Sequence, residues 1–125
     1  MNIEEFLSAY LAAALWSSYG DDGEPLDAEY GADDIAPETL AAMRADCADF
    51  MASNTADLAE YEGGFPPDKW TASERAGHDF WLTRNGHGAG FWNRDLGDLG
   101  CQLSDAATVY RGVHLYIGDD GKVHA

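Results

Sequence analysis

Apolar residues recur at steps of three and four in three stretches of the chain, residues 3–18, 37–61 and 95–110. This spacing places one apolar stripe along a helix, so each stretch is predicted to be helical. Glycine and proline interrupt the pattern, which predicts a loop over residues 20–37. Gly63-Gly64 and then Pro66-Pro67 are expected to break the chain a second time.

A further helix is predicted over residues 72–84 from its end signals. Thr71-Ala-Ser-Glu74 matches a capping box, in which two side chains accept free backbone amides at the start of a helix. The Asn85-Gly86 pair favours a left-handed cap at its end. The alternative is a strand over residues 80–84 with Asn85-Gly86 as a hairpin turn. The specific cap favours the helix.

The last thirteen residues carry the clearest strand signal. Residues 113–117 alternate apolar and polar side chains, and Asp120-Gly121 supplies a turn, so an antiparallel hairpin is predicted. Residues 89–93 are expected to form a short strand or an extended segment. A chain of 125 residues favours one domain. The predicted fold class is therefore α+β: a single, mostly helical domain with a small C-terminal antiparallel hairpin or sheet.

Charge divides this domain into two unlike halves. The chain has 23 acidic and seven basic residues, a formal net charge of −16. Residues 1–62 hold fifteen acids and one base, Arg44, whereas residues 63–125 hold eight acids and six bases. Such a surface repels nucleic acid and anionic membranes and attracts basic proteins, including those that hold nucleic acid. An acidic surface spread evenly over the molecule would indicate only solubility. Acid concentrated in one half of the chain indicates a binding surface.

Two segments of the acidic half supply the predicted partner-binding surface. One is the loop over residues 20–37, and the other is the helix over residues 37–61. On that helix, positions eleven apart return to nearly the same angle about 16 Å along the axis, which pairs Asp46 with Asp57 and Asp49 with Glu60. The predicted residues are Asp21, Asp22, Glu24, Asp27, Glu29, Asp33, Asp34, Asp46, Asp49, Asp57 and Glu60. The alternative is that the acid is a solvated face, typical of a protein from a high-salt or GC-rich host.

The stretch GHDFWLTRNGHGAGFW, residues 77–92, concentrates histidine, glycine and aromatic residues. His78, Asp79, His87 and Asp95 are metal ligands by type, but the histidines are nine residues apart, unlike the spacing in H-E-x-x-H. We therefore expect no metal, no cofactor and no enzymatic activity. The glycines are expected to let four aromatic residues pack closely in the core: Phe80, Trp81, Phe91 and Trp92.

The strings DFWLTRNGHGAGFWNR (79–94), LGDLG (96–100) and YIGDDGKV (116–123) resemble those of a group of small proteins encoded by phages, plasmids and other mobile elements. The likeness covers about residues 71–125 and leaves the acidic half outside. The group supplies no catalytic residues to carry over. The resemblance implies a genetic setting, in which mobile DNA is in conflict with host defence.

A cytoplasmic location in a bacterial or archaeal host is expected. The start, MNIEEF, has no basic region before an apolar one, and the apolar run over residues 9–16 is too short to span a bilayer. Cys47 and Cys101 form no C-x-x-C pair, which favours free thiols in a reducing compartment. Cys47 lies on an apolar helix stripe and is expected to be buried.

Together these features favour an acidic phage or mobile-element protein that binds and inhibits a basic host protein of defence or DNA processing, with mimicry of nucleic acid as the means. One alternative is a small metal-dependent hydrolase or nuclease that uses His78, Asp79 and His87. Another is an adaptor that binds through exposed aromatic residues, with Trp16, Tyr19, Tyr30 and Phe65 as the candidates. Binding by an adaptor would survive salt, whereas binding by mimicry would weaken.

Overall fold

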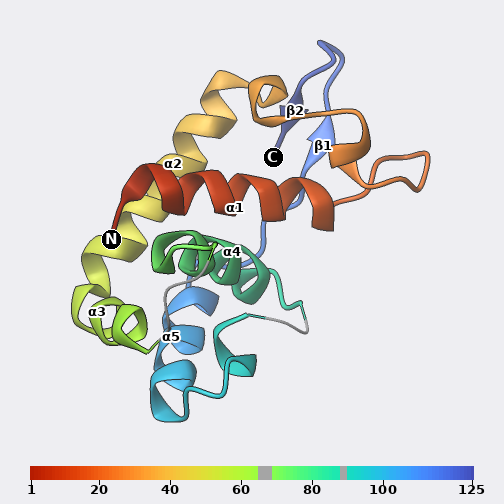
Figure 1. Ribbon diagram of the computed structural model, residues 1–125. Helices are drawn as coiled ribbons and strands as arrows, with labels where there is room; N and C mark the ends of the chain where they lie inside the picture. The colour runs from red at the N-terminus through yellow and green to blue at the C-terminus, as the bar shows by residue number, and fades with distance from the viewer. Residues whose placement is uncertain (65–68, 88–89) are drawn as a thin grey trace.

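A computed structural model describes residues 1–64, 69–87 and 90–125. These residues form five α-helices, three short 3-10 segments and one two-stranded antiparallel sheet, so the predicted α+β class is confirmed (Figure 1). The helices are α1 (Ile3–Ser17), α2 (Pro37–Ser53), α3 (Thr55–Gly63), α4 (Ala72–Arg84) and α5 (Asp98–Thr108). The other elements are η1 (Leu26–Ala28), η2 (Ala32–Asp34), η3 (Phe91–Asn93), β1 (Tyr116–Ile117) and β2 (Val123–His124).

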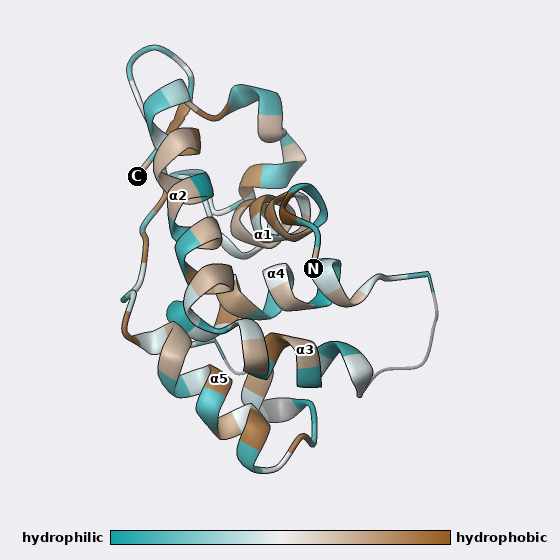
Figure 2. Ribbon diagram, turned by 90° about the vertical axis from the view of Figure 1, so that its left-hand side faces the viewer, coloured by the Kyte–Doolittle hydropathy of each residue, from teal (hydrophilic) through white to brown (hydrophobic). Residues whose placement is uncertain are grey.

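The centre of the fold is the packing of α1 against α4. Gly77 makes the close approach possible, because a Cβ built at this position would lie 2.0 Å from the Phe6 carbonyl oxygen. Figure 2 views α1 nearly along its axis, beside α4, with hydrophobic colours over much of its ribbon. The aromatic core continues from these helices into α2, where Phe50 stacks on Phe80 with 4.2 Å between ring centroids. One buried cluster thus includes residues from both halves of the chain, 1–62 and 63–125.

The single helix predicted over residues 37–61 is wrong, because it divides into α2 and α3 at Asn54. The backbone of Asn54 leaves the helical region, with φ −128° and ψ 31°. Its side-chain amide donates to the Phe50 carbonyl at 2.9 Å, and the Thr55 hydroxyl donates to the Met51 carbonyl at 3.1 Å. Short polar side chains that bond the backbone in this way compete with a continuing helix. The change of direction lets α3 bury Leu58 and Tyr61.

The end signals of α4 are confirmed, and the strand alternative over residues 80–84 is wrong. At the start, the Thr71 hydroxyl accepts from the Glu74 amide at 3.1 Å, while the Glu74 carboxylate accepts from the Thr71 amide at 2.9 Å. At the end, Gly86 has φ +72° and donates to the Thr83 carbonyl at 3.1 Å. The next amide, of His87, donates to the Leu82 carbonyl at 3.0 Å. This pair of bonds is a Schellman motif.

Two predicted elements differ after α4. Where an extended segment was expected over residues 89–93, residues 91–93 form η3, and residue 89 lies outside the described residues. The helix expected over residues 95–110 is shorter, because Asp95 and Gly97 have φ of 58° and 62° and delay its start to Asp98. The proline pair at 66–67 also lies outside the described residues.

The predicted C-terminal hairpin is confirmed. Tyr116 pairs with His124 and Ile117 with Val123, and Gly121 has φ +77° in the turn. The hairpin is also tied to the loop before α2, since the Ala36 amide donates to the Val123 carbonyl at 2.9 Å. Cys47 is buried and Cys101 exposed, and both thiols are free, as expected. Among the described residues, no helix has the length and apolar character needed to cross a membrane.

Candidate functional site

The candidate functional site is an acidic lobe, which we define as residues 20–38 together with residues 116–124. The loop starts at the C-terminal end of α1, and the loop and the hairpin then lie next to each other on one side of this helix (Figure 1). Leu26 and Ile35 anchor the loop with exposed fractions of 3% and 4%. Backbone hydrogen bonds hold its course, including Leu26 N to Ser18 O at 2.8 Å and Gly20 N to Glu24 O at 3.0 Å. The loop therefore has a defined shape.

The acidic lobe carries almost pure negative charge. It contains ten acidic residues and one basic residue, Lys122, for a formal net charge of −9. Seven of the eleven predicted partner-binding residues lie here, and all seven are exposed: Asp21, Asp22, Glu24, Asp27, Glu29, Asp33 and Asp34. Glu38, Asp119 and Asp120 complete the set.

Several carboxylates of the acidic lobe are held in place by backbone amides. Asp22 accepts from the Glu24 amide at 3.0 Å, and Asp34 accepts from the Gly31 amide at 2.8 Å. Asp120 accepts from the Lys122 amide at 3.0 Å and lies 3.0 Å from Nε2 of His124. The hydrogen bond from the Lys122 amide is the main cause that holds the pKa of Asp120 below its usual range, and the hydrogen bond with His124 lowers this pKa further. These charges sit at fixed positions before any partner arrives.

The other four predicted residues lie on α2 and α3, outside the acidic lobe. The break at Asn54 means that residues eleven apart no longer share one helix axis, so the predicted pairing of Asp46 with Asp57 and of Asp49 with Glu60 is wrong. Two of these carboxylates accept hydrogen bonds from other parts of the fold: half-buried Asp46 from Arg84, and exposed Asp49 from the Tyr110 hydroxyl. Asp57 is half-buried, and Glu60 is exposed.

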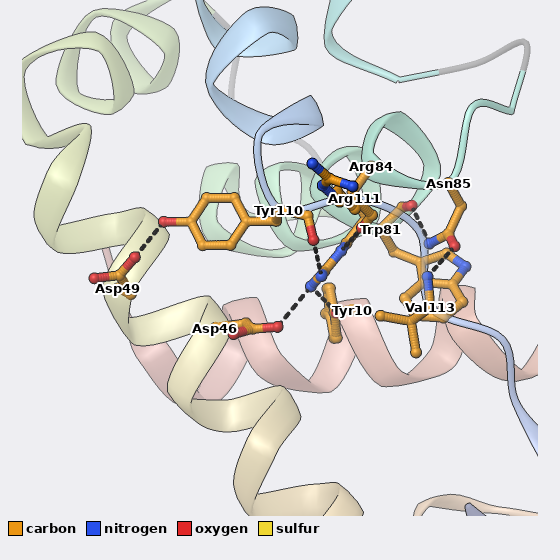
Figure 3. A network of polar contacts seen from close by, with 9 residues as sticks. All are labelled: Tyr10, Asp46, Asp49, Trp81, Arg84, Asn85, Tyr110, Arg111 and Val113. Atoms are coloured by element: carbon orange, nitrogen blue, oxygen red, sulfur yellow. Dashed lines mark hydrogen bonds and ion pairs between the residues drawn. The ribbon is translucent and has the colours of Figure 1, made fainter. Parts of the chain in front are cut away.

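Asp46 pairs with Arg84, which is the centre of a network of polar contacts (Figure 3). The Arg84 side chain is 4% exposed and contacts Asp46 at 2.9 Å and the Tyr10 hydroxyl at 3.0 Å. It also donates to the backbone carbonyls of Tyr110 at 2.8 Å and Arg111 at 2.7 Å. One guanidinium thus joins α4 to α1, to α2 and to the segment after α5.

Asp79 has a structural environment of the same kind. Its side chain is fully buried and accepts two hydrogen bonds from Arg94, at 2.8 and 3.0 Å, and one from the Tyr61 hydroxyl at 2.8 Å. His78 Nδ1 lies 3.4 Å away. Burial alone would raise the pKa of Asp79, but the hydrogen bonds from His78, Arg94 and Tyr61 outweigh burial and lower that pKa.

The three residues of the hydrolase alternative differ in their surroundings. Asp79 is buried and bound by Arg94, His78 is partly buried in the middle of α4, and His87 is exposed after the Schellman turn. Within the described ranges, no three histidine, cysteine or acidic side chains converge as a metal site. The geometry of Asp79 is that of a carboxylate that holds an arginine in place.

Gly90 allows a close approach of the glycine-rich stretch to α4, against Thr83 and not against an aromatic ring. Gly90 has φ +139°, and an added Cβ would lie 2.2 Å from the Thr83 hydroxyl oxygen. Phe80, Trp81 and Phe91 are buried as predicted, but the expectation for Trp92 is wrong, because 56% of its surface is exposed. The 3-10 turn of η3 directs neighbouring side chains to different sides. Gly88 lies outside the described residues.

The aromatic residues of the adaptor alternative are partly accessible. Trp16 is 44% and Tyr19 62% exposed, and Tyr30 is half-buried. Trp16 stacks on His78 with 6.1 Å between ring centroids. Phe65 lies outside the described residues.

Sequence patterns alone missed the assembly of the acidic lobe and the roles of Arg84 and Arg94. The turn at Asp120-Gly121 was recognisable, but its position beside the loop depends on the contact between Ala36 and Val123. No local signal marks Arg84 as the partner of Asp46, because 38 residues separate them. Comparison with family models, with curated proteins and with solved structures finds no match to this chain.

Proposed function

We propose that this protein is an inhibitor from a phage or mobile element, and that its acidic lobe binds a basic, nucleic-acid-binding host protein. The observation that supports the proposal is the density of carboxylates: ten acids and one lysine lie on a loop and a hairpin that are joined by a backbone hydrogen bond, and three of the ten carboxylates accept backbone amides. Proteins that grip nucleic acid gather lysine and arginine to neutralise phosphates. Fixed carboxylates can occupy the same basic surface, and so exclude nucleic acid from it.

The proposed setting is the cytoplasm of a bacterial or archaeal cell, where mobile DNA meets defence and DNA-processing proteins. The resemblance of residues 79–94 to mobile-element proteins supports this setting. The charge supports a protein as partner, because a chain of net charge −16 repels nucleic acid and anionic membranes. No catalytic step belongs to the proposal, since the Asp79 carboxylate is engaged by Arg94 and Tyr61.

The test compares two variants that each lose four acids. One neutralises the acidic lobe at positions whose carboxylates make none of the backbone contacts described above: Asp21→Asn, Asp27→Asn, Glu29→Gln and Asp33→Asn. The matched control neutralises exposed acids elsewhere: Glu62→Gln, Asp95→Asn, Asp98→Asn and Asp105→Asn. Each tagged protein is incubated with nuclease-treated bacterial lysate, and the retained proteins are eluted with salt or with duplex DNA.

The proposal predicts that the wild type and the control variant retain a nucleic-acid-binding protein that both salt and duplex DNA release. The lobe variant should lose this protein, because it lacks four of the carboxylates that would take the place of phosphates on the partner's lysines and arginines. Retention that is equal in all three proteins, or that neither salt nor DNA reverses, would show that the acidic lobe is not the binding surface.

The adaptor alternative has one observation in its favour, the exposure of Trp16 and Tyr19. It predicts a retained protein that survives high salt and is lost on Tyr19→Ser. The same incubation therefore separates it from the proposal.

A further inference from the structure

An apolar groove runs along α1. The loop of the acidic lobe, over residues 27–32, forms one wall of this groove. Its volume is about 520 Å³. Leu7, Leu11 and Leu15 form its floor at four-residue steps, and Trp16 and Tyr30 line it as well. In Figure 1 the loop segment with η1 and η2 passes alongside α1. This volume falls in the range of about 300–1,000 Å³ typical of pockets that hold a ligand.

The charge around this groove has one sign. Among the described residues that line it, Glu4 and Asp27 are acidic and no side chain is basic. Glu4 forms an ion pair with Arg44, so the negative charge is strongest at the loop end. There the loop also carries Glu29, Asp33 and Asp34. An apolar floor bordered on one side by carboxylates fits a ligand that is apolar on one face and cationic on the other.

A second apolar groove of similar volume lies between the start of α1, α2 and α3, and it lacks this asymmetry. Its lining includes the acidic Glu62 and the basic Arg44, and the N-terminal ammonium lies 4.0 Å from Glu62. Mixed charges give no preference for a cationic occupant. Of the two grooves, only the one beside the acidic lobe has a lining charge that favours a cationic occupant.

We infer that the groove of Leu7, Leu11 and Leu15 binds a cationic amphipathic segment of the partner protein. Apolar side chains of that segment lie on the leucine floor, and its lysines or arginines face Asp27 and the rest of the acidic lobe. A second copy of this chain does not fit, because each copy has a net charge of −16. The inference rests on the proposed function and adds an apolar contribution to a contact that charge dominates. Salt screens the charges and releases the partner, but leaves the apolar contribution to the affinity unchanged.

The test uses two synthetic helical peptides of equal length and equal lysine content. One places leucine and the other alanine on the face opposite the lysines. Ala12 lines the groove and is exposed, so Ala12→Arg fills the groove without removing a core contact. Ala41→Arg, at an exposed position of α2, adds the same charge elsewhere and is the matched control. Affinities are measured by calorimetry at low and high salt.

The groove predicts that the leucine peptide binds at least about tenfold more tightly than the alanine peptide, and that this difference persists at high salt. Ala12→Arg should abolish the difference, and Ala41→Arg should keep it. Equal affinity of the two peptides, or a difference that Ala12→Arg leaves intact, would overturn the inference that the groove binds an apolar face. Equal, salt-sensitive binding that the lobe variant abolishes would still support the proposed function. If neither peptide binds, the groove inference fails, whereas the proposed function is decided by the incubation of the lobe variant with lysate.

Discussion

Carboxylates have opposite fates in the interior of this molecule and in its acidic lobe. In the interior, Asp79 is fully buried against Arg94, and Asp46 closes the network around Arg84. In the acidic lobe, Asp22 and Asp34 are held by backbone amides two or three residues away, and their side chains remain exposed. The interior acids form ion pairs with arginines from another part of the chain, whereas the lobe acids remain exposed at the surface. Acidic composition alone does not separate the two groups.

The strongest way to break this comparison is to remove Asp79. Asp79→Ala leaves the Arg94 guanidinium and the Tyr61 hydroxyl without their buried acceptor, and breaking a buried ion pair costs about 3–5 kcal/mol of unfolding free energy. Asp27→Ala, at an exposed position of the lobe, should change it by no more than about 0.5 kcal/mol. Urea denaturation followed by circular dichroism measures both. Equal losses in the two variants would mean that the distinction between the two regions is false.

Charge reversal tests the same distinction with a half-exposed interior acid. Asp46→Lys places a cation beside buried Arg84 and removes a hydrogen bond to a charged group, with an expected cost of about 2 kcal/mol. Asp33→Lys is the matched reversal in the acidic lobe and should be close to neutral. The two variants have the same net charge, so a difference in their urea midpoints reflects position alone. A neutral Asp46→Lys would remove Asp46 from the structural network.

Acid titration sharpens the comparison at Asp79. Its pKa is lower in the folded protein than in the unfolded chain, so the ionised carboxylate favours the folded state. This contribution is fully present above the unfolded pKa of about 3.9 and is lost as pH falls through the folded pKa. The unfolding free energy of the wild type should therefore fall more steeply below about pH 4 than that of Asp79→Asn. Parallel curves for the two proteins would contradict the assigned role.

The smallest expected effect lies within the acidic lobe. Asp22→Ala removes the acceptor of the Glu24 amide and should cost less than about 1 kcal/mol, because the site is exposed. Hydrogen exchange at the Glu24 amide should nevertheless accelerate, since the side chain holds that amide. Asp21→Ala removes a neighbouring exposed acid and is the control. An unchanged exchange rate in Asp22→Ala would mean that backbone contacts alone hold the loop.

Sequence patterns predicted the elements whose determinants lie within a few residues. The Thr71–Glu74 capping box, the left-handed turn at Gly86 and the Asp120-Gly121 hairpin all form as predicted, because the bonds that define them join near neighbours. The apolar spacing of α1 likewise predicted a buried face. By contrast, the break at Asn54 was missed, because the apolar stripe continues through it.

The sequence by itself determined the class of fold, the caps and turns, and the concentration of acid in residues 1–62. Only the tertiary structure decided which acids face solvent, that the hairpin joins the loop through Ala36 and Val123, and that Trp92 lies outside the core. The physical reason is the range of the interactions. A cap or turn is satisfied by atoms a few bonds along the chain, whereas the fate of a carboxylate depends on which cation or amide the fold brings to it, and for Asp46 that cation lies 38 residues away.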